Sequence, residues 1–256
     1  MSDAHVHMGY FDRYGHEEPF YYSPRRVAGL LGRCKAGEFI VSSTCAQVEC
    51  IPLEDIFREA REMRRVAGAQ AHQFFWLSGH LYDEDRELTF LDTGLYEGVK
   101  FHEGETAWSR ARRKDIERIL AMVGERGLPV QFHCGPLEGC KPGELARWAE
   151  KFPGIRFDFA HCYEPEEMAL VMADHENVYV DALCLYEDDM RRLADFDWHG
   201  RLMFGSDFPA RHRDPAAKGF AIEYRRMQRL FALSGVDGDA AFRRFVGHVH
   251  GEDVVP

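Results

Sequence analysis

The sequence lacks the features that would point to a membrane protein, a secreted protein or a nucleic-acid-binding protein. No apolar run approaches the ~20 residues that a membrane-spanning helix needs. The first residues do not show the basic, then apolar, then small-residue order of a secretory signal. The net charge of −11, with no lysine- or arginine-rich stripe, argues against a polyanionic partner. We therefore expect a protein that acts on a small molecule, without a nucleic acid or a membrane as partner.

The cysteines show no regular spacing, and the sequence shows no boundary between domains. The seven cysteines are an odd number without regular spacing, which predicts reduced thiols and a cytoplasmic location. No linker, repeat or low-complexity tract interrupts the 256 residues. We therefore expect a single domain covering residues 1–256. The sequence leaves open whether the chain forms a homo-oligomer.

Short apolar segments alternate with amphipathic helical segments along the whole chain. Strands are predicted at 3–7, 39–41, 72–77, 98–102, 130–133, 155–161, 178–181 and 202–207. Helices are predicted between Ser23 and Gly37 and at 52–67, 115–125, 143–151, 165–173, 188–196, 216–234 and 239–245. Alternation of this kind predicts a parallel sheet, and eight such units predict a closed (β/α)8 TIM barrel of the α/β class.

The first predicted strand carries two histidines, His5 and His7, within Asp3-Ala4-His5-Val6-His7. Side chains on a strand alternate between its two faces, so both imidazoles point the same way and can hold one divalent metal. The alternative is chance, because a chain with thirteen histidines contains such a pair easily. The pair alone does not decide between the two interpretations.

Further polar residues fall at the ends of later predicted strands. Active sites of α/β barrels lie at the carboxyl ends of the strands. The residues at these ends are His5 and His7, then Lys100 and His102, then His133, His161 and Asp207. One histidine at a strand end is more often a core or loop residue, but this many at successive ends favour a site. We therefore predict a metal centre at this end of the barrel.

These residues resemble the metal-dependent amidohydrolase superfamily. The most similar branch contains the aminocarboxymuconate-semialdehyde and aromatic-acid decarboxylases, together with hydrolases of lactones and amides. The resemblance covers nearly the whole chain and rests on Asp3-Ala4-His5-Val6-His7, Gly98-Val99-Lys100-Phe101-His102, Val130-Gln131-Phe132-His133, Phe159-Ala160-His161-Cys162 and Leu202-Met203-Phe204-Gly205-Ser206-Asp207-Phe208-Pro209. TatD-type nucleases share the barrel and the H-x-H opening. They typically place glutamate where this chain has Lys100, which disfavours that family.

The resemblance implies a ligand set for one divalent metal: His5, His7, His133 and Asp207. Three imidazoles and one carboxylate suit Zn²⁺ best, although Mn, Fe or Ni would also fit. His161 lies outside the metal shell in this assignment and orients water or carries a proton. Asp207 combines metal binding with proton acceptance, so the predicted catalytic residues are His161 and Asp207.

Lys100 has two interpretations. In two-metal members of the superfamily, a lysine at this strand is carbamylated and bridges a second metal, which the resemblance makes an alternative here. Otherwise Lys100 is a cation that binds a substrate carboxylate or forms a structural ion pair. We predict that Lys100, His102 and Arg211 contact the substrate. The aromatic segment 8–22 is predicted to be a loop that covers the mouth of the barrel.

The function predicted on these grounds is hydrolysis of an amide, lactone or ester of a small metabolite by metal-activated water. The alternative is a metal-dependent decarboxylase, a lyase of a small unsaturated or aromatic carboxylic acid on the same scaffold. A TatD-type nuclease and a non-catalytic, metabolite-binding barrel are less favoured. The complete set of strand-end residues argues against loss of catalysis.

Overall fold

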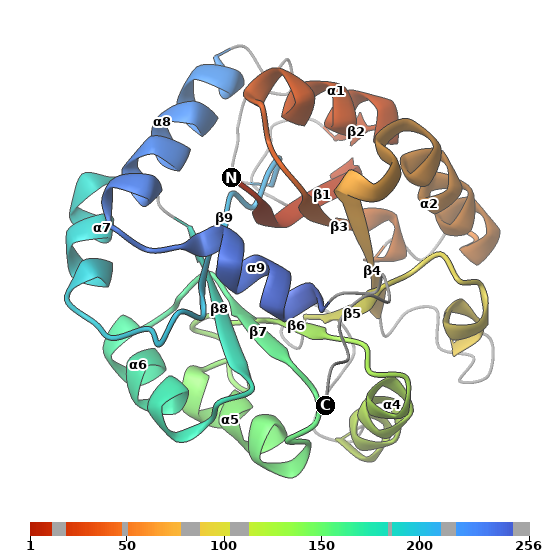
Figure 1. Cartoon of the computed structure of the whole chain (residues 1–256). Coiled ribbons are helices and arrows are strands. Elements are labelled where there is room, and N and C mark those ends of the chain that lie inside the picture. The colour runs from red at the N-terminus through yellow and green to blue at the C-terminus, as the bar shows by residue number, and fades with distance from the viewer. Residues whose placement is uncertain are drawn as a thin grey trace, which may run out of the picture.

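The strands of the computed structural model form one curled, mostly parallel sheet whose ends meet (Figure 1). The structure describes residues 1–11, 19–47, 51–77, 88–102, 113–183, 186–210 and 219–247. Neighbours follow chain order among β1 (Asp3–Phe11), β3 (Phe39–Ser43), β4 (Ala71–Leu77), β5 (Gly98–Phe101), β6 (Val130–His133), β7 (Phe157–Ala160), β8 (Val178–Leu183) and β9 (Leu202–Gly205). The strands coincide with the predicted ones to within a few residues.

The barrel closes between its first and last parallel strands. Val6 in β1 forms a parallel bridge with Phe208, just beyond β9, and the backbone N–H of His7 donates to the carbonyl of Phe208 at 2.6 Å. Both faces of a parallel strand are buried in this architecture, so the strands read as apolar runs. The predicted (β/α)8 barrel is therefore confirmed.

Helices surround the sheet (Figure 1). The described helices are α1 (Pro24–Cys34), α2 (Leu53–Ala67), α4 (Arg113–Glu125), α5 (Pro142–Lys151), α6 (Pro165–Asp174), α7 (Glu187–Ala194), α8 (Phe220–Leu233) and α9 (Gly238–Val246). Helix α1 begins as predicted, because the Ser23 side chain accepts from the Arg26 N–H and Pro24 occupies the first turn. It ends before the predicted Gly37, because Lys35 adopts a left-handed conformation at φ 55°. No helix among the described residues is long and apolar enough to span a membrane.

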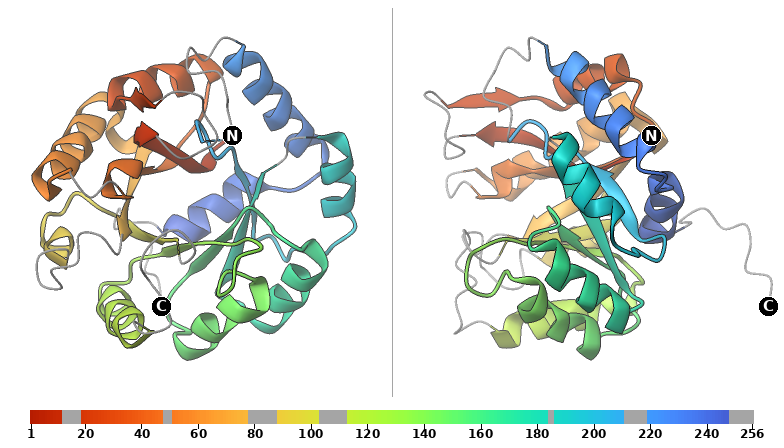
Figure 2. Two further views of the ribbon diagram at one scale, coloured as in Figure 1. Left: turned by 180° about the vertical axis from the view of Figure 1, so that it is seen from behind. Right: turned by 90° about the vertical axis from the view of Figure 1, so that its left-hand side faces the viewer.

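Helix α9 lies across the amino-terminal opening of the barrel and plugs it (Figures 1 and 2). Phe242, Phe245 and Val246 of α9 form a buried cluster with residues of five strands, including Phe74 and Tyr179. The Phe245 ring lies 6.0 Å from Phe74 and 5.4 Å from Tyr179. Because this end is filled, a small molecule reaches the barrel interior only from the opposite end, where the strands finish.

Segment 8–22 is a β-hairpin where the structure describes it, so the loop prediction is wrong there. Residues up to Phe11 continue β1, and β2 (Phe20–Tyr22) pairs with them antiparallel, with Phe11 opposite Phe20. The two rings stack at 5.0 Å, and Tyr22 is fully buried. Aromatic residues favour strands and pair across them. That preference outweighed the missing periodicity in this segment.

The hairpin projects from the end of the barrel opposite α9 (Figure 2). This is the end at which the parallel strands finish, as the lid hypothesis requires. Residues 12–18, between β1 and β2 in the sequence, lie outside the described residues. Closure over the mouth and contact with substrate therefore stay predictions.

The cysteines match the expectation of unpaired thiols. The described cysteines, Cys34, Cys45, Cys134, Cys140 and Cys162, are all buried and form no disulfide. Burial raises the pKa of Cys162 and of its neighbour Cys134 well above the ordinary value of a thiol. These thiols are therefore protonated packing groups rather than nucleophiles.

His72 forms a half-buried ion pair at the end of the barrel covered by α9. Its Nδ1 lies 2.6 Å from Glu97 Oε2 and its Nε2 lies 3.0 Å from Glu38 Oε2. Burial lowers the pKa of His72, but the hydrogen bonds to Glu97 and Glu38 outweigh that effect and raise it above 6.5. A raised folded-state pKa gives stability that is present below the unfolded pKa and is lost as pH rises through the folded pKa.

We expect His72→Gln to lower the free energy of unfolding by about 1 kcal/mol near pH 6, because part of the ion pair is solvent-exposed. The deficit relative to the wild type should shrink as the pH is raised through the folded-state pKa of His72, above which the imidazole is neutral. Urea unfolding of both proteins across this range measures the difference. A deficit that does not change with pH would contradict a charged His72.

Candidate metal centre

His5 and His7 point into the barrel from β1 and are almost completely buried, at 1% and 3% exposure. Strand geometry places both on one face, as predicted. Their Nε2 atoms lie 3.0 Å apart. The Asp207 carboxylate reaches the same point from the turn after β9, with Oδ1 3.1 Å from His7 Nε2 and 3.6 Å from His5 Nε2.

The spacing of these three donor atoms fits a metal ion. Bonds of about 2.0–2.1 Å to Zn²⁺ at tetrahedral angles place ligand atoms ~3.3 Å apart. The observed separations of 3.0, 3.1 and 3.6 Å bracket that value. Two imidazole nitrogens and a carboxylate oxygen are also the donor types that such an ion takes. The donors present therefore fit the predicted metal.

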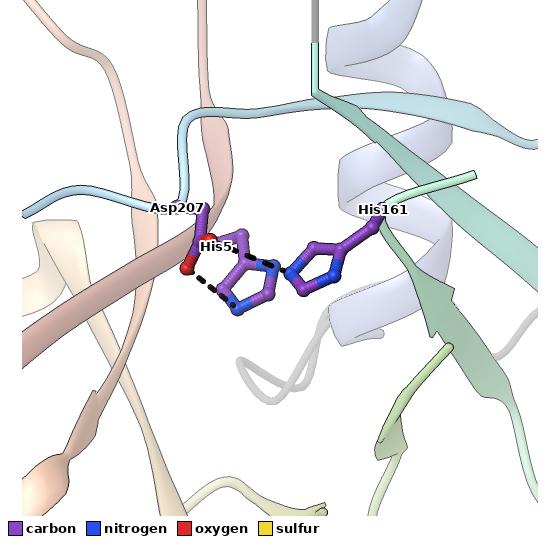
Figure 3. Close-up of side chains that lie close together, drawn as sticks. All are labelled: His5, His161 and Asp207. Atoms are coloured by element: carbon purple, nitrogen blue, oxygen red, sulfur yellow. Dashed lines mark ion pairs between the residues drawn. The ribbon is translucent and has the colours of Figure 1, made fainter. Parts of the chain in front are cut away.

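His161 joins this group from the turn after β7 (Figure 3). Its Nε2 lies 3.6 Å from Asp207 Oδ2, and its ring stacks on His5 at 4.8 Å with an interplanar angle of 6°. Ligand atoms of His5, His161 and Asp207 all lie within 4.8 Å of one another. Among the described residues, the buried Nε2 of His161 has no hydrogen-bond partner. This nitrogen is therefore available to a metal, a water molecule or a substrate.

The backbone at both strand ends is unusual. His161 has φ 77° and Asp207 has φ 50°, and Cys162 and Glu164 in the same turn as His161 are also left-handed. Left-handed conformations cost energy for residues other than glycine and cluster at functional sites. Here they turn the side chains of His161 and Asp207 toward the barrel axis.

Second partners orient the two histidines of β1. His5 Nδ1 lies 3.0 Å from Asp181 Oδ2, and His7 Nδ1 lies 3.0 Å from Ser42 Oγ. A carboxylate accepts the proton of His5 Nδ1, which leaves the lone pair of Nε2 directed at the metal position. Ser42 can do the same for His7.

The protonation states suit metal binding. Burial lowers the pKa of His7, and it lowers the pKa of His161 to about 3 and that of His133 to about 2. Burial raises the pKa of Asp207, but His5, His7 and His161 outweigh it and hold the pKa well below 3.8. His7, His133 and His161 are therefore neutral and Asp207 is an anion at neutral pH, as ligation requires.

His133 and His102 lie together on the other side of His161. Their rings stack with centroids 3.8 Å apart, and the His133 ring meets His161 edge-on at 4.8 Å. A β-carbon on Gly135 would lie 2.9 Å from His133 Nε2, so this nitrogen faces its own loop. The structure thus places both predicted residues beside His161, but the group of possible metal ligands among the described residues is His5, His161 and Asp207 and does not include His133.

Lys100 lies beneath the histidines and is 1% exposed. Its Nζ is 2.6 Å from His5 Nε2 and donates to Gln131 Oε1 at 3.0 Å. Burial lowers its pKa to about 8, against the opposing effect of Asp207 and other carboxylates. Arg211, which was predicted to contact the substrate, lies outside the described residues.

Two further buried carboxyl groups lie below the site. Gln131 Nε2 donates to Asp158 Oδ2 at 2.8 Å and contacts Asp181 Oδ2 at 3.4 Å. Burial raises the pKa of Asp158 well above its usual value, and the charge of Asp181 raises it further. Asp158 is therefore the member of the pair that holds a proton.

Asp3, the first residue of the predicted H-x-H segment, fixes β1 in place. Its carboxylate accepts from the backbone N–H of His5 at 3.1 Å, the N–H of Ser206 at 3.0 Å and the Tyr224 hydroxyl at 2.7 Å. Burial raises its pKa to about 7. Asp3 therefore ties β1 to the end of β9 and to α8, which aligns His5 with Asp207.

Sequence reasoning missed the residues that support the ligands: Ser42, Gln131, Asp158 and Asp181. Two of them were visible as polar residues at strand ends, because Asp181 ends the predicted strand 178–181 and Ser42 follows 39–41. Gln131 and Asp158 are buried polar residues within predicted strands, where a hydrogen-bond partner is required. A polar residue within a predicted buried strand was therefore the sign in the sequence that Gln131 and Asp158 belong to a hydrogen-bond network.

A cavity of about 400 Å³ borders His161 at the ends of β7 and β8. Its wall includes Tyr163, Leu183, Leu193 and Arg192. A larger cavity of about 510 Å³ lies between β2, α1 and α2 and contains none of the site histidines. Of these two cavities, the smaller one is the one that His161 lines.

A sequence model of the amidohydrolase family matches residues 50–245, most of the chain. The chain belongs to the amidohydrolase family. The match includes Lys100, His133, His161 and Asp207, and it begins after His5 and His7. No curated protein matches the sequence.

Solved structures similar to this amidohydrolase confirm its fold. A probable 2-pyrone-4,6-dicarboxylic acid hydrolase from Acinetobacter baumannii is 11% identical, with TM-score 0.59 over 96% of this chain and 98% of the other. The 4-oxalomesaconate hydratase of Rhodopseudomonas palustris is 12% identical, with TM-score 0.65 over 96% and 95%. The IDCase of Metarhizium anisopliae is 14% identical, with TM-score 0.61 over 96% and 94%. At these identities the likeness concerns the fold alone.

Proposed function

We propose that this protein is a metal-dependent hydrolase that uses an activated water molecule on an amide, lactone or ester of a small metabolite. The observation that carries the proposal is the group of donors from His5, His7 and Asp207, with the available nitrogen of His161 beside it. The buried Asp207 carboxylate and the imidazoles around it are ligands that favour a bound cation, in addition to the neighbouring Lys100 ammonium.

In this proposal His5, His7, His133 and Asp207 hold one divalent metal, with Zn²⁺ the best fit and Mn, Fe or Ni as alternatives. When bound, such an ion supplies a Lewis acid and lowers the pKa of water toward ~7. The carboxylate of Asp207 accepts a proton from the attacking water. His161, 3.6 Å from Asp207 Oδ2, takes that proton and delivers it to the leaving group.

The substrate occupies the mouth of the barrel and extends into the 400 Å³ cavity beside His161. A site of this volume suits a small metabolite. His102, stacked on His133, and Arg211 are proposed to contact the substrate. Lys100 is held below them by His5 and Gln131, so its cation acts on the substrate through the electrostatic field of the site.

A lyase reaction is the second candidate, because the same available nitrogen of His161 could protonate the carbon that remains after loss of carbon dioxide. The buried Lys100 cation would favour a carboxylated substrate at this point. A carbamylated Lys100 with a second metal is the alternative metal arrangement, and a pKa of about 8 leaves part of the lysine neutral.

The two reactions are separated by a panel of lactones, esters, amides and unsaturated or aromatic carboxylic acids. We expect acid release from one of the first three classes, abolished by a chelator and restored by added Zn²⁺. His199→Ala is the matched control, because His199 is an exposed histidine in the turn before β9. Its activity should equal that of the wild type.

Release of carbon dioxide without hydrolysis would show that the protein is a lyase rather than the proposed hydrolase. Hydrolysis that survives complete removal of metal would contradict the role of the ion.

A further inference from the structure

Asp181 in β8 touches two histidines that come from opposite parts of the sequence. Its Oδ2 lies 3.0 Å from His5 Nδ1 in β1. Its Oδ1 accepts the backbone N–H of His161, after β7, at 3.2 Å. The residue is fully buried. One carboxylate group therefore contacts the ring of His5 and the backbone of His161, the two residues whose rings stack against each other in the site.

The two contacts have different consequences. The Oδ2 contact selects the His5 tautomer that carries its proton on Nδ1, so that Nε2 presents a lone pair. The Oδ1 contact holds the N–H of a residue with φ 77°, a conformation that is uncommon for residues other than glycine. Loss of Asp181 would release both the ring of His5 and the turn of His161.

Gly205 provides the space for this carboxylate. A β-carbon at Gly205 would lie 2.5 Å from Asp181 Oδ1 and 2.8 Å from its Cγ. Real β-carbons do not approach other atoms so closely, and Asp181 is enclosed by Gln131 and His5. Gly205 is absent from the residues with positive φ, so its backbone alone does not demand glycine. The glycine of Gly-Ser-Asp is therefore explained by the neighbouring side chain.

We propose that Asp181 is a positioning residue for the metal centre, which sets the tautomer of His5 and the turn of His161, and that Gly205 is glycine because it admits the Asp181 carboxylate. The effect on metal binding rests on the proposed function. The effect on His5 does not, because the contact with Asp181 exists without a metal.

The first test measures the tautomer of His5 in metal-free wild-type protein by ¹⁵N NMR of the imidazole rings. We expect a protonated Nδ1 and an unprotonated Nε2. Asp181→Asn, which removes one acceptor oxygen, and Gly205→Ala, which displaces the carboxylate without changing a polar group, should both mix the two tautomers. A wild-type His5 protonated on Nε2 would overturn the inference without use of any variant.

The second test measures Zn²⁺ affinity by competition with a chromogenic chelator. Loss of a group that orients a ligand typically weakens metal binding about 10–100-fold, and we expect this for both Asp181→Asn and Gly205→Ala. The matched controls are Asp188→Asn, which alters an exposed carboxylate on α7, and Gly32→Ala on α1, where a β-carbon meets no atom within 4 Å. Both controls should bind within about 3-fold of the wild type.

Different results would contradict the proposed metal-dependent function and the positioning role of Asp181. Wild-type protein that binds no Zn²⁺ but shows the expected His5 tautomer would remove the proposed function and leave the positioning role intact. Normal Zn²⁺ affinity in Asp181→Asn and Gly205→Ala would overturn the positioning role and leave the function standing.

Discussion

Protein in which His5 and His7 are both replaced by alanine should contain no bound divalent metal and should have no metal-dependent activity. The two Nε2 atoms lie 3.0 Å apart and, with Asp207, form the donor group that fits an ion. Removal of both leaves a carboxylate and more distant imidazoles, too few donors for a tetrahedral site. Elemental analysis of the purified variant measures the result directly.

The control for this variant is His72→Ala together with His199→Ala, which removes two histidines outside the site. That protein should keep the metal content of the wild type. Full metal occupancy in the His5 and His7 double variant would show that the ion binds elsewhere, and the assignment would then be wrong.

His161→Ala should lower the turnover rate by about 10²–10⁴-fold, the usual contribution of a positioned acid or base. In the proposed arrangement His161 lies beside Asp207 but does not hold the ion, so the metal content should stay the same. Lys100→Met should likewise retain the metal. Steady-state kinetics and elemental analysis of the same preparations separate the two effects.

Loss of metal from these variants would identify a different metal arrangement. Loss of metal from either His161→Ala or Lys100→Met would make His161 a ligand and Lys100 a bridging carbamate, which is the two-metal arrangement. The grouping of His161 with His5 and Asp207 within 4.8 Å makes this a sharp test.

Most of the fold follows from the sequence, because the period of its hydrophobic pattern changes clearly between strands and helices. The parallel strands are short apolar runs, such as Val130–His133, between amphipathic segments such as 52–67. The exception is the hairpin of β1 and β2, where an aromatic-rich segment without alternation suggested a loop. Its strands are stabilised by cross-strand rings such as Phe11 and Phe20, a pairing that only the register reveals.

The site was predictable where strand ends define it and not where it depends on long-range contacts. His5, His7, His161 and Asp207 could be found because parallel strands finish at one end of a barrel. The roles of Asp181 and Gly205 could not, because they depend on a contact between neighbouring strands whose side-chain direction the sequence does not specify. The exact arrangement of His133 relative to His161 likewise depends on the loop at Gly135.

Elemental analysis of wild-type protein, purified without added metal or chelator, tests the central claim most directly. The account predicts one first-row divalent ion per chain, with zinc predominant. Protein that contains no such ion, and that binds none when Zn²⁺, Mn²⁺, Fe²⁺ or Ni²⁺ is supplied, would contradict it.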